Sequence, residues 1–318
     1  MDMSDATRMP QTLRGPLRES EPMAKHVSWR AGGAARLFFQ PVDVADLRDF
    51  LAQVPARMPI LFLGLGSNLL VRDGGFPGAV VLTHRAFGDR PLVLSAGTSG
   101  LSPVDYGFAC TAGAGVPAPH VARFVAKHGG GGAEWLAGVP GTVGGALAMN
   151  AGCYGGETWN HVTEVETIDR AGDLHRRAPS EYETGYRHVR LRSNAEEWFV
   201  SARLAFPRGD SGASMARIRE LLARRVATQP LNLPNAGSVF RNPEGDHAAR
   251  LIESCGLKGF TIGGAQVSPK HANFIVNVGG ATAADIETLV DHVQATVEGR
   301  TGIALIREVR IVGEARHG

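Results

Sequence analysis

Glycine is concentrated in one stretch of this chain. Residues 129–156 contain 11 glycines among 28 residues, and residues 138–145 contain four within eight. In a regular element each glycine costs about 0.5–1 kcal/mol relative to alanine, because glycine loses more conformational freedom on folding. Such a density indicates backbone that turns sharply or lies directly against a ligand. The whole chain shows the same bias, since 41 of its 318 residues are glycine, well above the usual share of about 7%.

The remaining composition excludes several classes of protein. Hydrophobic residues make up 43% and charged residues 20% of the chain, as in soluble globular proteins. The net charge of +2 gives no indication of a nucleic-acid partner, and no apolar run approaches the roughly 18 residues of a membrane span. Three distant cysteines without a Cys-x-x-Cys pair argue against a disulfide scaffold or a metal site and favour the cytoplasm. Residues 1–25 contain no apolar signal segment and predict a disordered leader.

Residues 26–207 have the pattern of a mixed domain. Apolar residues 60–63 and 79–82 predict buried strands among helical segments. Residues 162–168 and 198–206 alternate in the manner of antiparallel strands. The pattern indicates an α/β or α+β fold, and we expect α+β.

A second, smaller α+β domain is expected over residues 213–312. The Pro- and Gly-rich residues 207–212 predict a linker before it. Its last helix should span residues 283–297, after Thr282, which has an acidic residue three positions on, and before Gly299. Residues 313–318 form a short tail.

One glycine motif resembles a dinucleotide-binding turn. Residues 113–118 match Gly-x-Gly-x-x-Ala at the start of a predicted helix. However, Pro117 and Pro119 remove amide donors from the turn that would hold a phosphate, and Thr111 and Ala112 make a poor parallel strand before it. We interpret the motif as a tight turn before an amphipathic helix.

Two other glycine segments are better placed to bind a ligand. Residues 64–68, Gly-Leu-Gly-Ser-Asn, directly follow an apolar strand, so their amides can converge on an anion, although this segment alone is more typical of an ordinary turn. Residues 138–145 suit a flat ring or a pyrophosphate lying on the main chain. No lysine follows them as in a P-loop, which argues against a nucleoside triphosphatase.

These segments together resemble the MurB family of UDP-N-acetylenolpyruvoylglucosamine reductases. The resemblance extends over residues 27–313, and its most specific part is Gly-Ser-Val-Phe-Arg-Asn-Pro at 237–243. The matching stretches, in chain order, are residues 28–33, 64–73, 138–156, 185–187, 234–243, 263–277 and 307–310.

The resemblance implies an FAD-binding domain of the vanillyl-alcohol-oxidase (PCMH) type, followed by the substrate domain. The FAD-binding subdomains would span about 26–95 and 96–207, and the tail would return to the first of them. The long tyrosine-bearing insertion of one family branch is missing, so the chain looks like the shorter branch. We expect non-covalent FAD and a monomer. The implied flavin contacts are Gly64, Leu65, Gly66, Ser67, Asn68, Leu69, Gly138, Gly141, Thr142, Gly144, Gly145, Ala151 and Gly152.

The resemblance also implies the reaction, a step in peptidoglycan precursor synthesis. NADPH reduces FAD, and the flavin then passes hydride to an enolpyruvyl ether on a UDP-sugar. Arg187 would bind the carboxylate on which negative charge develops, because a guanidinium makes two parallel bonds to a carboxylate. Ser238 would donate the proton to the other carbon. Glu308 would polarise the enolpyruvyl group in its protonated form.

Three further residues are candidates for substrate binding. Arg241, where the family usually has lysine, and Asn242 would hold the UDP diphosphate. His271 is a substrate-side candidate, with a structural histidine as the equal alternative. The run His188-Val189-Arg190 departs from the serine-containing run common in the family.

Two rival functions remain open from the sequence. A flavin-dependent alcohol oxidase or dehydrogenase has the same fold, but many of these tether FAD through His or Cys, and nothing singles out such a residue here. A non-enzymatic binding protein with a basic patch would fit the pI of about 8.5. Neither rival explains why Arg187, Ser238 and Glu308 all occur within their motifs.

Overall fold

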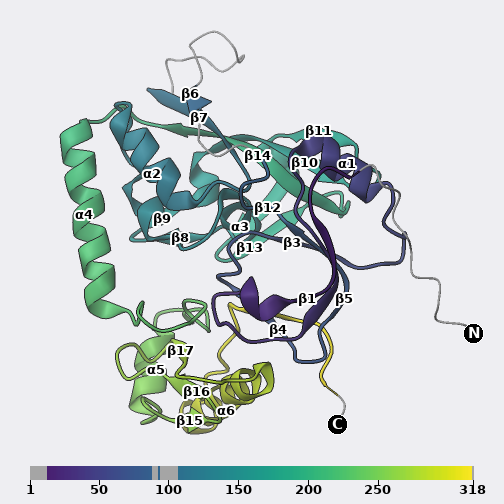
Figure 1. The fold of residues 1–318 in the computed structure, drawn as a ribbon. Helices are drawn as coiled ribbons and strands as arrows, with labels where there is room; N and C mark the ends of the chain where they lie inside the picture. The colour runs from purple at the N-terminus through teal and green to yellow at the C-terminus, as the bar shows by residue number, and fades with distance from the viewer. Residues whose placement is uncertain (1–12, 88–91, 94–106, 317–318) are drawn as a thin grey trace, which may run out of the picture.

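The computed structural model describes residues 13–87, 92–93 and 107–316. Its first part is a four-stranded sheet in which β1 and β2 are antiparallel and β2, β5 and β3 are parallel (Figure 1). The helix α1 starts at Asp43, whose carboxylate accepts a hydrogen bond from Asp46 N, and packs its apolar face on the sheet. The elements are β1 (Leu17–Pro22), η1 (Met23–Lys25), β2 (Ala34–Phe39), α1 (Val44–Leu51), β3 (Ile60–Leu63), β4 (Leu69–Val71) and β5 (Phe76–Leu82).

The N-terminal segment corrects one prediction. We expected a disordered leader over residues 1–25, but residues 17–25 form β1 and η1. Leu17 and Pro22 lie opposite Phe39 and Ala34 of β2, and Met23 is fully buried. The charged residues of β1 led to the error, because an edge strand exposes one face and so lacks an apolar run. Residues 13–16 are also described and belong to no helix or strand, and residues 1–12 of the predicted leader lie outside the described residues.

The second part contains a five-stranded antiparallel sheet in the order β11-β10-β14-β7-β6. The strands predicted at 162–168 and 198–206 are confirmed as β10 and β14. The elements are β6 (Leu92–Val93), β7 (Phe108–Gly113), α2 (Ala118–Lys127), η2 (Glu134–Gly138), α3 (Val143–Ala148), β8 (Gly152–Cys153), β9 (Gly156–Glu157), η3 (Thr158–His161), β10 (Val162–Asp169), β11 (Leu174–Arg177), η4 (Pro179–Glu181), β12 (Tyr182–Gly185), β13 (His188–Leu191) and β14 (Glu197–Phe206).

The Gly-x-Gly-x-x-Ala motif is a packing feature. The motif begins at the last residue of β7, and β7 is a strand of an antiparallel sheet. The motif therefore does not belong to a parallel β-α-β unit of the described residues. A Cβ on Gly113 would overlap the carbonyl oxygen of Phe87, and a Cβ on Gly115 would overlap that of Thr83. These glycines therefore let residues 83–87 cross directly over the turn before α2.

The helix α4 (Ser211–Thr228) moves the predicted domain boundary. Asp210, in the segment expected to be a linker, caps the helix by accepting a hydrogen bond from Ala213 N at 2.7 Å. Ile218 of α4 is part of the buried core of the second part, and Met215 and Leu222 pack against this core. Figure 1 shows α4 standing beside α2. The third part of the molecule therefore begins after α4 and not at residue 213.

The third part packs α5 and α6 against a small antiparallel sheet. The helix α6 has the predicted capping box of Thr282 and Asp285. It runs past Gly299 and ends at Gly302, which has a φ of 72°; this left-handed conformation is the one that favours glycine at a helix end. The elements are α5 (Ala248–Ser254), β15 (Thr261–Ile262), β16 (Ala265–Val267), β17 (Ile275–Asn277), α6 (Ala283–Thr301) and β18 (Arg310–Val312).

The chain end fastens the third part to the first. β18 pairs in parallel with β4, and Glu314 bridges to Gly75, so the tail returns to the first part. Asp73 accepts hydrogen bonds from Ala283 N and Ala284 N, which begin α6. These contacts hold β18 and the start of α6 against the first part.

An ion pair contributes to the same junction, and it predicts a pH-dependent stability. Arg72 donates from Nε and Nη2 to the two carboxylate oxygens of Glu287 at 2.8 and 2.7 Å, and this contact holds the pKa of Glu287 below its ordinary value. A carboxyl whose pKa is lower in the folded state than in the unfolded state stabilises the fold at pH above the unfolded-state pKa of about 4.3. This stabilisation is lost as the pH falls through the folded-state pKa. We expect Glu287→Gln to lower the free energy of unfolding by about 1 kcal/mol at pH 7.

Urea unfolding of both proteins at pH 7 and at pH 3 checks this, because the difference should vanish in acid. Glu220→Gln is the control, since Glu220 pairs with Arg217 on the exposed surface of α4. A difference of the same size at both pH values would contradict the assignment to this ion pair.

Candidate active site

A cavity of about 730 Å³ lies where the three parts meet. Its volume is within the usual range of about 300–1,000 Å³ for small-molecule sites. Its wall includes β3 and residues 64–69 from the first part and residues 236–238 from the third. From the second part it includes β12, β13 and residues 138–142, 144–146, 148–149 and 151–153. All the flavin contacts expected from the sequence line it: Gly64, Leu65, Gly66, Ser67, Asn68, Leu69, Gly138, Gly141, Thr142, Gly144, Gly145, Ala151 and Gly152.

The loop of residues 64–68 presents unused backbone donors to the cavity wall. Among the hydrogen bonds of the described residues, none is donated by the backbone amides of residues 65–68. Gly66 has a φ of 61° and packs against Val27, so the loop turns at this glycine. Consecutive amides in such a turn are a favourable partner for a phosphate group.

The glycines of residues 138–156 serve two purposes. A Cβ on Gly156 would overlap the Trp135 ring, and one on Gly138 would stand 2.7 Å from Cys153 Sγ, so protein packing requires both. A Cβ on Gly141 would meet nothing closer than Ser67 Oγ at 3.5 Å, and one on Gly145 nothing closer than Thr142 Oγ1 at 3.8 Å. Packing does not require these last two, so their bare backbone is available to a ligand in the cavity, as a flavin dinucleotide needs.

Arg187 reaches the cavity from the tight turn between β12 and β13. Gly185 and His188 form the last pair of the hairpin, so Arg187 belongs to the two-residue turn between them. Its φ is 54°. A left-handed conformation is unfavourable for arginine and costs about 1–3 kcal/mol. The guanidinium is held by two carbonyl oxygens, of Asn150 at 3.3 Å and Gly152 at 2.9 Å.

The same guanidinium contacts Glu308, so two predicted catalytic residues meet. Arg187 Nε donates to Glu308 Oε1 at 2.8 Å, and the two side chains are 15% and 16% exposed. Burial raises the pKa of Glu308, while Arg187 and Arg241 oppose the shift. The balance favours the protonated carboxyl more than in water, as the expected role of Glu308 requires.

Backbone pairing brings Ser238 to the same wall. Glu308 N donates to Val239 O at 2.8 Å, and Phe240 bridges to Arg307, so the segments that carry Ser238 and Glu308 run side by side. Gly237, before the serine, has a φ of 75° and turns the chain. No hydrogen bond of Ser238 Oγ occurs among the described residues, and the side chain lines the cavity.

The three residues predicted to bind substrate lie outside the cavity lining. Arg241 is close enough to Glu308 to lower its pKa, and its Nε is buried without a partner among the described residues. Asn242 is exposed, and its N donates to Tyr186 Oη at 3.4 Å. His271 packs edge-on against Phe274, and burial lowers its pKa. Its Nδ1 is buried without a hydrogen-bond partner among the described residues.

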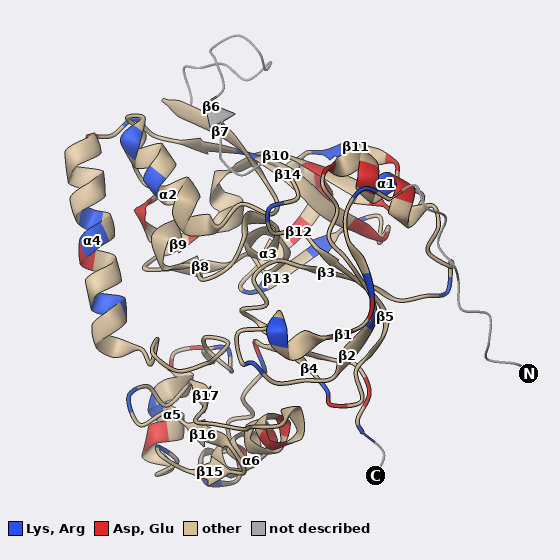
Figure 2. Ribbon diagram, viewed as in Figure 1, with Lys and Arg blue, Asp and Glu red and all other residues tan. Residues whose placement is uncertain are grey.

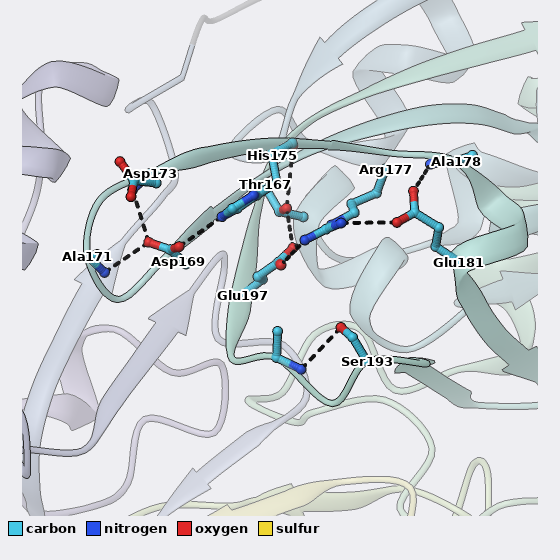
Figure 3. Close-up of polar contacts among 11 residues, drawn as sticks. Thr167, Asp169, Ala171, Asp173, His175, Arg177, Ala178, Glu181, Ser193 and Glu197 are labelled. Carbon is cyan, nitrogen blue, oxygen red and sulfur yellow. Dashed lines mark hydrogen bonds and ion pairs between the residues drawn. The ribbon is translucent and has the colours of Figure 1, made fainter.

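Sequence reasoning missed the far end of the cavity. Phe62 and Trp198 line it and stack with ring centroids 4.7 Å apart. Glu197 lies beside them, with its carboxylate bound by Arg177 Nη2 at 2.6 Å and Thr167 Oγ1 at 2.6 Å (Figure 3). These bonds fix the Glu197 carboxylate in the cavity wall, and Arg177 balances its charge. The five residues come from four strands, β3, β10, β11 and β14, and no local motif marks them.

A second missed residue is Arg225, near the end of α4. It lines the cavity, and its Nε donates to Gln229 Oε1 at 2.9 Å. No ion pair of the described residues includes it, and burial lowers its pKa. A buried guanidinium without a carboxylate partner is a favourable site for an anionic ligand group. Its helical position between exposed residues gave no signal in the sequence.

Other features of the described residues are simpler. No group of three or more His, Cys, Asp or Glu is placed to hold a metal ion there. Within the same residues, every helix is too short or too polar to cross a membrane. Charged residues of both signs are interspersed over the molecule (Figure 2).

Comparison with known proteins gives one consistent result. Residues 229–312 match the family model of the C-terminal domain of UDP-N-acetylenolpyruvoylglucosamine reductase, and residues 35–177 match that of an FAD binding domain. The chain is 58% identical over 305 residues to the UDP-N-acetylenolpyruvoylglucosamine reductase of Thiobacillus denitrificans, covering 95% of this chain and 94% of the relative. It is 54% identical over 312 residues to that of Methylococcus capsulatus, covering 98% of each.

A solved structure agrees with this. The crystal structure of UDP-N-acetylenolpyruvylglucosamine reductase (MurB) from Thermus caldophilus superposes with a TM-score of 0.75 at 30% identity, covering 94% of this chain and 98% of that one. The predicted α+β fold with an FAD-binding domain is confirmed. The chain belongs to the UDP-N-acetylenolpyruvoylglucosamine reductase (MurB) family.

Proposed function

We propose that this protein reduces UDP-N-acetyl-3-O-(1-carboxyvinyl)-glucosamine, an enolpyruvyl ether, to UDP-N-acetylmuramate in peptidoglycan precursor synthesis. NADPH is the reductant, and FAD is the bound cofactor. The observation that carries the proposal is the meeting of Arg187, Ser238 and Glu308 on one wall of a cavity that is otherwise lined by glycine loops. An arginine, a hydroxyl and a protonated carboxyl are what the reduction of an enolpyruvyl group needs.

The glycine loops of the cavity would hold FAD in this proposal. The unused backbone amides of residues 65–68 would bind its pyrophosphate, and the bare backbone of Gly141 and Gly145 would lie against the cofactor. The aromatic pair of Phe62 and Trp198 provides an apolar end for the adenine. FAD bound there would supply hydride transfer from NADPH to the methylene carbon of the substrate.

Arg187 binds the carboxylate of the enolpyruvyl group. Nη1 and Nη2 each use one hydrogen on a carbonyl oxygen, so each keeps one for the substrate. The guanidinium is held before substrate arrives and needs no rearrangement when negative charge spreads onto the carboxylate.

Ser238 donates a proton to the substrate carbon, and Glu308 carries a proton on its carboxyl group. The serine hydroxyl is a poor acid, so the negative oxygen it leaves needs nearby positive charge. Arg241, whose charge acts on the neighbouring Glu308, would supply it. Glu308 in its protonated form donates a hydrogen bond to the enolpyruvyl group. Arg225 and Arg310, which also line the cavity, attract the phosphates of the UDP-sugar and of NADPH.

Anaerobic flavin spectroscopy tests the proposal. NADPH should bleach the bound flavin, and UDP-N-acetylenolpyruvoylglucosamine should restore its colour, whereas simple alcohols should not reduce it. Reduction by an alcohol, or flavin retained in the denatured precipitate, would favour an oxidase or dehydrogenase. A colourless protein that ignores NADPH would favour a binding protein. We further propose a monomer acting in the cytoplasm, which gel filtration and cell fractionation check.

A further inference from the structure

We propose that Asn150 is the positioning residue for Arg187. This inference rests on the proposed function, because it concerns the arginine that binds the substrate carboxylate. Asn150 follows α3, is 3% exposed and does not line the cavity. It acts through Arg187 and has no contact with the ligand.

Asn150 holds Arg187 at two places. Its carbonyl oxygen accepts a hydrogen bond from Arg187 Nη1 at 3.3 Å. Its side-chain Nδ2 donates to the carbonyl oxygen of Gly185 at 3.0 Å, two residues before the arginine. One residue therefore fixes both the guanidinium and the turn from which it extends.

The remaining contacts of Asn150 anchor it in the second part of the molecule. Nδ2 also donates to Glu157 Oε2 at 3.1 Å, and Oδ1 accepts from Trp159 N at 3.1 Å. Both amide protons and the amide oxygen are thus used. Of the residues of this size, only asparagine supplies two donors and an acceptor together.

The backbone of both residues shows why such an anchor is needed. Asn150 has a φ of 40° and Arg187 a φ of 54°. Asparagine tolerates the left-handed region, whereas arginine does not favour it. A strained turn persists only where its surroundings determine it, and the Gly185–Asn150 bond supplies that constraint. Without it the turn relaxes, and the guanidinium moves away from Glu308.

Asn150→Asp tests the inference, because the carboxylate keeps the size but loses both donors to Gly185 O and Glu157. We expect reoxidation of the reduced flavin by substrate to slow by about 10- to 100-fold, with reduction by NADPH and flavin content retained. The pKa of Glu308 should rise when the Arg187 guanidinium moves away, because that charge opposes the effect of burial. In a pH profile of the reoxidation rate, the change that reports protonation of Glu308 should therefore move to higher pH. Asn194→Asp is the matched control, since Asn194 is exposed and also left-handed at 57°.

A double-mutant cycle shows whether Asn150 acts through the arginine. In an Arg187→Lys background, Asn150→Asp should slow reoxidation by less than a further threefold. If the double variant instead loses the product of the two single losses in rate, the inference is overturned. If Asn150→Asp does not fold, Asn150→Gly keeps the left-handed backbone and the carbonyl and takes its place. A crystal structure of the variant shows the position of the Arg187 guanidinium independently of activity. An Arg187–Glu308 contact still at 2.8 Å would overturn the inference. Wild-type protein that substrate fails to reoxidise would instead overturn the proposed function.

Discussion

Ser238→Ala is expected to leave the reduction of the bound flavin by NADPH within about threefold of wild type while slowing its reoxidation by substrate about 10³-fold. The reason is that Ser238 acts only when the substrate carbon takes up a proton, and loss of a general acid costs about 10²–10⁴-fold. The methyl group of alanine fits the same position, and no hydrogen bond of Ser238 Oγ within the described structure is lost. Anaerobic stopped-flow spectroscopy of the two half-reactions measures both rates.

Ser254→Ala is the control for this prediction. Its hydroxyl bonds Leu251 O at the end of α5, and the residue does not line the cavity, so both half-reactions should keep their wild-type rates. Equal losses in the two half-reactions of Ser238→Ala would contradict the role of proton donor. They would show that the serine supports the cofactor site.

The elements that the sequence predicts correctly are those with strong local signals. The apolar run of β3 and the capping box at Thr282 depend on neighbouring residues alone, so their positions follow from the sequence. β1 and the boundary after α4 depend on distant partners. β1 is a charged edge strand held by β2, and α4 belongs to the second part because Ile218 is buried there. Sequence spacing contains neither contact.

The same distinction applies to the cavity. Its glycine loops and Arg187, Ser238 and Glu308 lie in motifs, and the structure brings them to one wall. Within residues 138–156 the sequence does not separate glycines needed for packing, such as Gly156 against Trp135, from glycines that face open space, such as Gly145. Only the neighbours in space make that distinction. Glycine density therefore predicted a crowded backbone correctly, and the structure divides it between packing and ligand.

Arg187→Lys is expected to slow flavin reoxidation by substrate about 10²–10³-fold and to raise the KM for the UDP-sugar, with reduction by NADPH retained. Lysine keeps the positive charge but is a point charge on a flexible stem. It cannot bond Asn150 O, Gly152 O and Glu308 together and still offer two parallel donors to a carboxylate. Removal of one fixed donor from developing negative charge costs about 10²–10³-fold, and stopped-flow rates at several substrate concentrations separate this loss from weaker binding.

Arg190→Lys is the matched control for the arginine. Arg190 lies on the neighbouring strand β13 and pairs with Glu183 at an exposed position, where lysine makes an equivalent pair, so its rates should equal those of wild type. Reoxidation of Arg187→Lys within threefold of wild type would show that positive charge alone is sufficient at this position. The substrate carboxylate would then be recognised by charge, and the strained turn and its anchors would have no catalytic purpose.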